Sequence, residues 1–170
     1  MVTLYEDIVE TPCGALSLVF DAQETLLHLD FPDQGDRQNR LLSRRYKRFE
    51  LVKRQSRIIR PHLEAYMAGN YGALEKISCD PGGSPFQQTV WQELKSIPVG
   101  QTISYRELAI KIGNPQAVRA VARANALNPI SLIYPCHRVI GANGKLTGYA
   151  GGLERKKWLL NHEGVQDIED

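Results

Sequence analysis

A stretch of proline and glycine near the middle of the chain, residues 80–85, most constrains how the chain can fold. Its sequence, Asp-Pro-Gly-Gly-Ser-Pro, interrupts helices and strands, because proline lacks a backbone donor and glycine is conformationally free. On both sides of it, apolar residues recur with the spacing of regular secondary structure. We therefore predict two domains, over residues 1–80 and 86–170, joined by a linker over residues 81–85.

The N-terminal half is predicted to be a β-sheet with helices. The apolar spacing predicts strands over residues 4–9, 15–20, 25–31 and 49–52, and helices over residues 39–46 and 56–68. In the third strand Leu27, Leu29 and Phe31 share one face, which leaves His28 on the opposite, more exposed face. Ser56 is predicted to cap the second helix. This half carries no visible chemistry, and we expect it to support the other half structurally.

The C-terminal half is predicted to be mostly helical. Ser84 is expected to cap a helix that begins directly after it. Ser104 and Glu107 stand three residues apart and form the capping box of the next helix. A turn containing glycine then leads to a third helix, with Pro115 at its first position. Helix, turn and helix in this order predict a helix-turn-helix motif. With a sheet in the N-terminal half and mostly helices in the C-terminal half, the predicted fold class is α/β (α+β).

The third of these helices has an unusual composition. Its side chains are mostly Ala and Val, whereas Arg119 and Arg123 lie four residues apart on one face. Small side chains let a backbone approach a partner closely, and arginines can contact phosphates or enter a stack of bases. The alternative is an alanine-rich core helix whose arginines face water.

Positive charge is concentrated in the C-terminal half. Residues 86–164 contain 10 Lys and Arg against 4 Asp and Glu, whereas residues 1–85 contain 11 against 12. The last six residues, 165–170, include three acidic residues and no basic ones, and no role for this acidic tail is visible. A basic half indicates an anionic partner such as a nucleic acid, although a solvated basic face is the alternative.

Cys136 is the candidate nucleophile. Apolar residues over 130–133 predict a buried strand before it, and residues 141–144 form a turn-rich break after it. A thiol becomes a strong nucleophile as the thiolate, and the adjacent His137 and Arg138 supply a possible base and a fixed positive charge. Buried cysteines are commonly inert, so the pattern alone leaves both interpretations open.

The run Pro135-Cys136-His137-Arg138-Val139-Ile140 resembles the active-site motif of the O6-alkylguanine-DNA alkyltransferases. The likeness extends from about Phe86 to Gly164, with the flanking helix-turn-helix and the loop Tyr149-Ala150-Gly151-Gly152. The likeness extends into the N-terminal half in length and layout, and the segments at residues 11–14, 66–70 and 81–86 most resemble the bacterial Ogt-type branch of that family. The resemblance implies a ribonuclease-H-like N-terminal domain and a winged helix-turn-helix-like C-terminal domain.

The resemblance also implies a mechanism. This family flips an alkylated guanine out of the duplex and transfers its O6-alkyl group to a cysteine, since a duplex hides the reacting atom. Cys136 matches the nucleophile, His137 the base that takes its proton through a water, and Glu163 the carboxylate that orients His137. Asn128 matches the residue that braces the loop near the cysteine. Because the product is a thioether, the protein is expected to act once per molecule.

Other residues match the DNA-binding surface of the family. Arg119 matches the arginine that fills the gap left by the flipped base, and Tyr105 matches the tyrosine that crowds the target phosphate. Arg123 shares the face of Arg119. Ala117 and Ala120 are small enough to let their helix lie in the minor groove, which carries little sequence information. The implied partner is double-stranded DNA bearing O6-alkylguanine, with O4-alkylthymine as a further possible lesion.

The resemblance implies a substrate pocket beside the cysteine. The carbonyl of Val139 matches an acceptor for the guanine amino group, and Tyr149 matches both a pocket wall and a proton donor to the leaving guanine. Ala150 stands where some relatives have Ser, and Gly151 follows it in the same glycine-rich loop. Ser131 replaces a proline found in some relatives, which bears on how bulky an alkyl group can fit.

Several absences are expected. The residues Cys13, His28 and His62 lack the pairwise spacing of zinc ligands, so we expect no metal and no cofactor. Three widely separated cysteines suit a reducing compartment, and the first residues do not resemble a signal peptide. No apolar run approaches the ~20 residues of a membrane helix. We therefore expect a cytoplasmic protein, acting as a monomer.

Three other functions remain open from the sequence. Alkyltransferase-like proteins bind damaged DNA without repairing it, but they carry another residue in place of the cysteine, and Cys136 is present. A helix-turn-helix regulator that uses Cys136 as a sensor would need a recognition helix with varied polar residues. A thiol hydrolase is a weaker third alternative.

Overall fold

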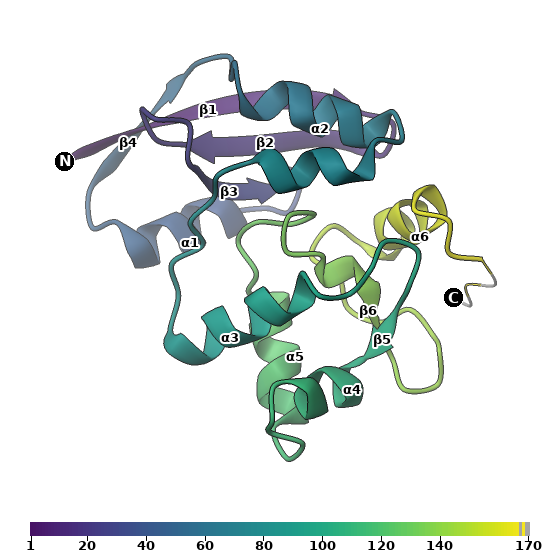
Figure 1. Cartoon of the computed structure of the whole chain (residues 1–170). Coiled ribbons are helices and arrows are strands. Elements are labelled where there is room, and N and C mark those ends of the chain that lie inside the picture. Colours follow the sequence, from purple (N-terminus) through teal and green to yellow (C-terminus); the bar gives the residue numbers. More distant parts are fainter. Residues whose placement is uncertain (167, 169–170) are drawn as a thin grey trace. The chain divides into compact units, whose positions relative to one another are not determined.

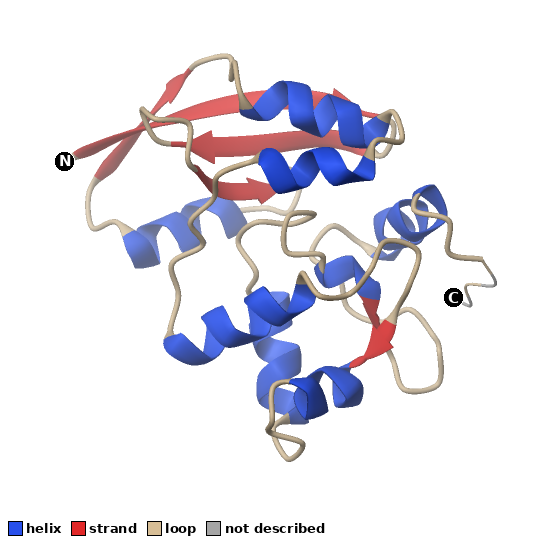
Figure 2. Cartoon of the chain, in the orientation of Figure 1, coloured by secondary structure: helices blue, strands red, loops and turns tan. Residues whose placement is uncertain are grey.

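A computed structural model describes residues 1–166 and 168 of the chain (Figures 1 and 2). The chain divides into two compact units, Met1–Gly82 and Gly83–Asp170. Each unit has its own elements and its own buried apolar residues. Within the described residues, no helix is both long enough and apolar enough to span a bilayer.

The first unit is built on a mixed four-stranded sheet. Its strands are β1 (Val2–Thr11), β2 (Gly14–Phe20), β3 (Leu26–Asp30) and β4 (Phe49–Lys53), arranged in the order β3-β2-β1-β4. The strands β1, β2 and β3 form an antiparallel meander, whereas β4 pairs with β1 in parallel. The edge strand β4 lies next to β1 because α1 (Arg37–Arg45) carries the chain from β3 across to the far side of the sheet.

Helices cover both faces of this sheet. Leu42 of α1 is buried in a cluster with Leu4 and Val19, while α2 (Ile59–Met67) lies along the other face, as Figure 1 shows. The buried residues of α2 are Ile59, Leu63 and Tyr66. A 3-10 helix, η1 (Tyr71–Lys76), follows α2 and leads to the end of the unit.

The prediction that His28 lies on the exposed face of its strand is wrong. The side chain is fully buried, and its Nε2 lies 3.8 Å from Oδ2 of Asp30, which is also paired with Arg37. Alternation predicts exposure only when one face of a sheet meets water. Here α1 supplies Arg37 and Leu42 to the second face, so polar residues on that face become buried too. Burial, together with the nearby charge of Arg37, lowers the pKa of His28 to about 3.

The start of α2 is held by two side chains, of which the sequence indicated only one. The Ser56 hydroxyl accepts hydrogen bonds from the backbone N–H of Ile59 at 2.9 Å and of Arg60 at 3.1 Å. Ser56 thus satisfies donors at the helix start as predicted, but α2 begins later than predicted, at Ile59, with Ile58 as its N-cap residue. Glu24, from the turn before β3, accepts the Ser56 hydroxyl at 2.5 Å and the N–H groups of Arg57 and Ile58. A carboxylate at a helix N-terminus satisfies free donors and complements the helix dipole.

As far as it is described, the second unit contains four α-helices and a short two-stranded sheet. Its elements are α3 (Pro85–Leu94), β5 (Ile103–Ser104), α4 (Tyr105–Lys111), α5 (Val118–Ala126), η2 (Cys136–Arg138), β6 (Val139–Ile140) and α6 (Leu153–His162). The strands β5 and β6 pair in parallel. The indole N–H of Trp91 on α3 donates to the Ala124 carbonyl of α5 at 2.7 Å, which ties these helices together.

The predicted caps of α3 and α4 are confirmed. The Ser84 hydroxyl accepts from the N–H of Gln87, and the Ser104 hydroxyl accepts from the N–H of Glu107, each within a complete capping box. Gly83, before the first box, has a φ of +85°, and a Cβ there would meet the Trp91 ring at 2.5 Å. Glycine is therefore required at this position both by conformation and by space.

The third helix of this unit begins later than predicted. Pro115 does not open α5 but stands in a turn closed by a hydrogen bond from the Ala117 N–H to the Asn114 carbonyl. Proline favours the second position of such a turn as well as the first position of a helix. Ala117 is consequently the N-cap residue, and α5 begins at Val118.

The buried segment before Cys136 is not a strand. Asn128 holds it in turns, because its side chain donates to the Tyr134 carbonyl at 2.7 Å and accepts from the Ile130 N–H at 3.0 Å. Leu132 has a φ of +71°, a left-handed conformation that a strand does not use. The prediction of burial is confirmed, whereas the predicted strand is wrong, since local hydrogen bonds to a side chain replace pairing with a neighbouring strand.

Candidate active site around Cys136

Cys136 is the first residue of η2 and lies directly after this braced loop. Its side chain is only 6% exposed, and its backbone N–H donates to the Tyr134 carbonyl at 2.7 Å. The short 3-10 helix then turns the chain into β6, which pairs with β5. The loop bracing by Asn128 and the pairing of β6 therefore fix the backbone on both sides of the thiol.

The two residues after Cys136 converge on one carboxylate. His137 Nε2 lies 2.9 Å from Glu163 Oε2, and both side chains are completely buried. Arg138 donates from Nε to Glu163 Oε1 at 2.8 Å and from Nη2 to Oε2 at 3.0 Å. A third bond, from Nη1 to the Ile97 carbonyl at 2.7 Å, anchors the guanidinium on its other side. The partner of Arg138, which the sequence left unassigned, is thus Glu163.

This geometry fixes the proton on His137. Burial raises the pKa of Glu163, but the hydrogen bonds and charges of His137 and Arg138 outweigh burial and hold the pKa well below its usual range. The carboxylate is therefore ionised and accepts, so His137 donates from Nε2 and carries a lone pair on Nδ1. Nδ1 is buried and has no hydrogen-bond partner among the described residues. Burial lowers the pKa of His137 despite Glu163, so the ring is neutral at neutral pH and can accept a proton.

Lys156 is a buried side chain near the site that the sequence reading missed. Its Nζ donates to the carbonyls of Val139 and Thr147, each at 2.6 Å, and lies 3.4 Å from the Gly148 carbonyl. Burial lowers the pKa of Lys156 to about 8, although negative charge on Cys136 acts in the opposite direction. One ammonium group therefore joins β6 to the loop that follows it. The signal was present, because Lys156 shares a helix face with Leu159 and Leu160.

The predicted pocket residues lie at different depths. Val139 and Ser131 are almost completely buried, Gly151 is buried, and Tyr149 and Ala150 are half-buried. All five come from the segments on either side of Cys136 or from the loop before α6 that Lys156 holds. Lys156 holds the loop before α6, and Asn128 braces the loop that leads to Cys136. The predicted pocket residues come from these two segments.

Tyr105 opens α4 and points toward the same loop. Its hydroxyl lies 3.4 Å from the Thr147 carbonyl, to which it donates. Burial raises its pKa above the usual value, and negative charge on Cys136 raises it further, whereas the hydrogen bond to Thr147 lowers it. The charge of Cys136 thus acts on a tyrosine of α4 as well as on Lys156 of α6.

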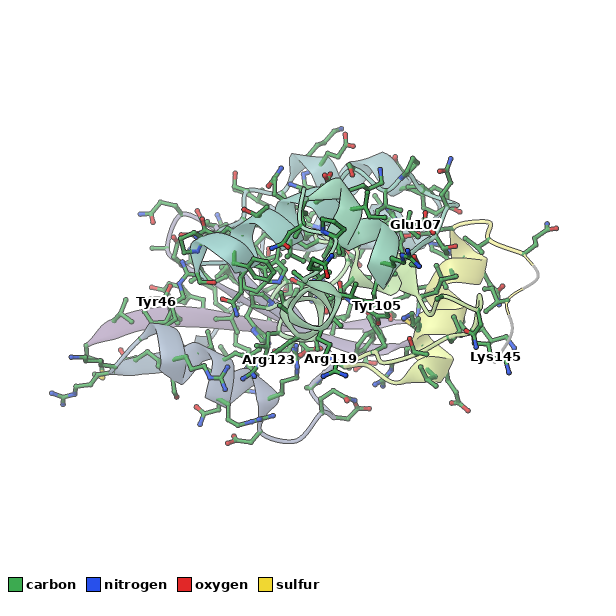
Figure 3. The ribbon with its side chains drawn as sticks, turned by 90° about the horizontal axis from the view of Figure 1, so that it is seen from below. Tyr46, Tyr105, Glu107, Arg119, Arg123 and Lys145 are labelled. Atoms are coloured by element: carbon green, nitrogen blue, oxygen red, sulfur yellow. The ribbon has the colours of Figure 1, made fainter. Side chains whose placement is uncertain are left out.

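The predicted DNA-contacting residues lie on or beside α5. Figure 3 shows Arg119 and Arg123 leaving this helix on the same side, and both are exposed. Ala120 is exposed between them, whereas Ala117 is half-buried at the N-cap. The exposed stripe of α5 therefore consists of small residues and two arginines, while Val121 and Ala124 face the core.

Within residues 1–166 and 168, no group of three or more His, Cys, Asp or Glu side chains is placed to hold a metal ion. Among the same residues, Cys13, Cys79 and Cys136 form no disulfide.

Residues 85–165 match the family model described as 6-O-methylguanine DNA methyltransferase, DNA binding domain. A methylated-DNA–protein-cysteine methyltransferase of Salmonella typhimurium is 46% identical over 168 residues, covering 96% of this chain and 98% of that protein. One from Methanosarcina acetivorans is 45% identical over 161 residues, covering 95% and 99%.

Solved structures are similar over the same length. The O6-methylguanine methyltransferase of Mycobacterium tuberculosis superposes with a TM-score of 0.77 at 39% identity, covering 96% of this chain and 93% of that one. The OGT of the same organism in complex with DNA gives a TM-score of 0.75 at 38% identity, covering 95% and 92%. The mixed α/β architecture of the chain agrees with these structures.

Proposed function

The chain belongs to the family of methylated-DNA–protein-cysteine methyltransferases, and from this premise we propose how its own residues carry out the transfer. It is a DNA-repair protein that accepts an alkyl group and is consumed by the reaction. Non-repairing binding and transcriptional regulation, the alternatives left open by the sequence, are not favoured by its relatives. We propose that the substrate is O6-alkylguanine in double-stranded DNA and that the acceptor is the Cys136 sulfur.

The observation that carries this proposal is the buried arrangement of His137, Glu163 and Arg138 beside Cys136. Ionised Glu163 orients the His137 ring, so the Nδ1 lone pair accepts the Cys136 proton through a water. The sulfur forms a bond to the alkyl carbon while the bond from that carbon to guanine O6 breaks. The electron pair of that bond stays on the guanine, which takes a proton from Tyr149. The resulting thioether is stable, so the protein acts once.

We propose that the pocket wall consists of Val139, Tyr149, Ala150, Gly151 and Ser131. The Val139 carbonyl already accepts from Lys156 and has a second lone pair for the guanine amino group. The backbone N–H of Ala150 would face O6, which keeps the contact that the main chain provides but lacks a hydroxyl. Asn128 acts indirectly, since it holds the loop that presents Cys136.

We propose that α4 and α5 act as a winged helix-turn-helix that enters the minor groove. Arg119 replaces the flipped base in the stack, and Arg123 contacts a phosphate from the same side of α5. Tyr105 crowds the target phosphate at the start of α4. Ala117 and Ala120 permit close approach to the groove. The exposed small residues of α5 support this mode, because a long polar side chain there would hold the backbone away.

The two units are proposed to have separate roles. The segment over residues 86–170 holds the DNA and the reactive thiol, residues 81–85 act as a linker, and residues 1–80 form a ribonuclease-H-like structural domain. We further propose that the protein acts as a monomer in a reducing compartment such as the cytoplasm, without cofactor or metal. Three cysteines that form no disulfide are consistent with that location.

A stoichiometric label tests the proposed transfer. The protein is incubated with a duplex that carries one O6-methylguanine with a radiolabelled methyl group, and the label on protein is counted over time. Label should saturate near one per molecule and should be absent with Cys136→Ser. Continued turnover, or transfer to the serine variant, would contradict the proposed acceptor.

A further inference from the structure

The near-neutral charge of the first unit hides a strongly basic segment. Residues 37–60 contain ten Lys and Arg and a single acidic residue, Glu50. Glu50 accepts a hydrogen bond from the Thr3 hydroxyl at 2.8 Å and so has a partner within the sheet. This segment includes α1, β4 and the start of α2, so its charges are carried by neighbouring elements of one unit (Figure 1).

Many of the balancing carboxylates are occupied inside the unit. Asp7 accepts from the Ser56 N–H and pairs with Arg60, Glu24 caps α2, and Asp30 pairs with Arg37. All three acidic side chains are buried. Counting residues therefore understates the surface charge, because buried carboxylates pair with groups inside the unit rather than with the exposed cations.

Seven basic side chains in this segment are exposed and have no ion-pair partner among the described residues. Five of them are Arg40, Arg44, Lys47, Arg48 and Lys53, which are called the basic edge below. Arg40 and Arg44 are four residues apart on α1, Lys47 and Arg48 form the connection, and Lys53 ends β4. The aromatic Tyr46 lies within the same stretch, with the Arg45 guanidinium 5.3 Å from its ring centroid.

Protection of a sheet edge does not explain this charge. The strand β4 is the outer strand of the sheet, and exposed lysines on edge strands prevent pairing with other chains. Lys53 alone could serve that purpose. Arg40, Arg44, Lys47 and Arg48 lie outside the strand, where they protect no unpaired backbone.

We propose that the basic edge binds the phosphate backbone of duplex DNA, outside the segment that the Gly83–Asp170 unit engages. The proposal rests on the proposed function, since it takes the same polyanion as partner. Exposed cations repeated along one short segment match the regular negative charge of a duplex. Because both units belong to one chain, DNA held by one unit is at high local concentration for the other. The first unit would then contribute to the search along DNA as well as supporting the second.

The test uses a long undamaged duplex and the full chain with Arg44→Gln, Lys47→Gln and Arg48→Gln combined. The association constant is measured at several salt concentrations. The slope of its logarithm against the logarithm of salt concentration should become shallower by about 0.9 for each phosphate contact removed. The charge-preserving set Arg44→Lys, Lys47→Arg and Arg48→Lys should keep the original slope, which separates loss of charge from loss of folding.

Lys76→Gln provides the matched control, because Lys76 is exposed on η1 outside the basic segment. This variant should bind with the original slope. An unchanged slope in the triple glutamine variant, or an equal change in Lys76→Gln, would overturn the proposal.

Transfer of label from a duplex with O6-methylguanine is counted in parallel with the unaltered protein. Failure there would contradict the proposed function, whereas an unchanged slope with normal transfer contradicts only the basic edge.

Discussion

At the scale of single residues, Arg138 determines how the charges around Cys136 balance. Its guanidinium contacts both oxygens of Glu163, so the carboxylate stays ionised and His137 keeps its proton on Nε2. Without Arg138, Glu163 would be a buried carboxylate that faces the neutral His137 ring instead of a cation. Arg138 is thus a positioning residue for the base, although it touches no substrate in the proposed mechanism.

We expect Arg138→Met and Glu163→Gln to be strongly non-additive. Each single change leaves an uncompensated buried charge, which costs about 3–5 kcal/mol of unfolding free energy. The double variant removes both charges and should lose clearly less than the sum. Denaturant unfolding of the four proteins measures the coupling. Additive losses would show that the two side chains do not act as a pair.

The acid limb of the transfer rate should lie below pH 6.5. Burial lowers the pKa of His137 below that value, so the ring is already neutral at pH 7 and becomes protonated only as the pH falls further. The rate with free O6-benzylguanine should therefore decline only below pH 6.5, since the base form is lost there. The half-buried His62 lies outside the site, and His62→Gln should leave the limb in place. A decline centred above pH 6.5 in the unaltered protein would contradict the assignment of His137.

At the scale of elements, α5 presents two arginines that should differ in function. Arg119→Ala should lower the transfer rate at saturating duplex far more than the rate with free O6-benzylguanine, because only the duplex reaction requires a flipped base to be replaced. Arg123→Ala should weaken binding to duplex while changing the saturated rate little, since a phosphate contact contributes to affinity. Single-turnover rates over a range of DNA concentrations separate the two effects. Equal losses with duplex and free base would remove Arg119 from the flipping role.

The first turn of α2 should depend on Glu24. Glu24→Gln should reduce the unfolding free energy by about 1–3 kcal/mol, because hydrogen bonds to a charged acceptor are lost. Burial raises the pKa of Glu24, but the bonds from Ser56 and the backbone outweigh it and leave the pKa lowered. Its contribution is therefore present above pH 4.5 and is lost as the pH falls below it. Glu75→Gln, an exposed change on η1, is the control. Equal unfolding curves for the two variants would contradict the cap.

The sequence predicted structural features set by neighbouring residues better than features set by residues far apart in the chain. The caps at Ser84 and Ser104 depend on side chains a few residues from the bonds that they make, so the sequence contains them completely. The burial of His28 depends on α1 crossing a face that alternation alone treats as open. The turns before Cys136 depend on the Asn128 side chain, which competes with strand pairing. In each miss, a contact distant in sequence or made by a side chain decided the conformation.

At the scale of the whole molecule, contacts between distant residues also limit how well the sequence predicts the site and the surface charge. The family resemblance predicted Cys136, His137 and Glu163 as nucleophile, base and orienting carboxylate, and the structure places His137 Nε2 2.9 Å from Glu163 Oε2. The roles of Arg138 and Lys156 became visible only once helix α6 and η2 were placed together in one unit. Surface charge cannot be counted from the sequence either. Lys53 is exposed and Asp7 is buried, so their charges do not cancel on the surface of the molecule.

Identification of the alkylated residue tests the central claim most directly. The protein is incubated with excess duplex containing O6-methylguanine, digested with protease, and its three cysteine-containing peptides are analysed by mass spectrometry. We expect one added methyl group, located on Cys136, with Cys13 and Cys79 unmodified and no further reaction after the first equivalent. A methyl group on another residue, or continued repair by protein already methylated on Cys136, would contradict the account.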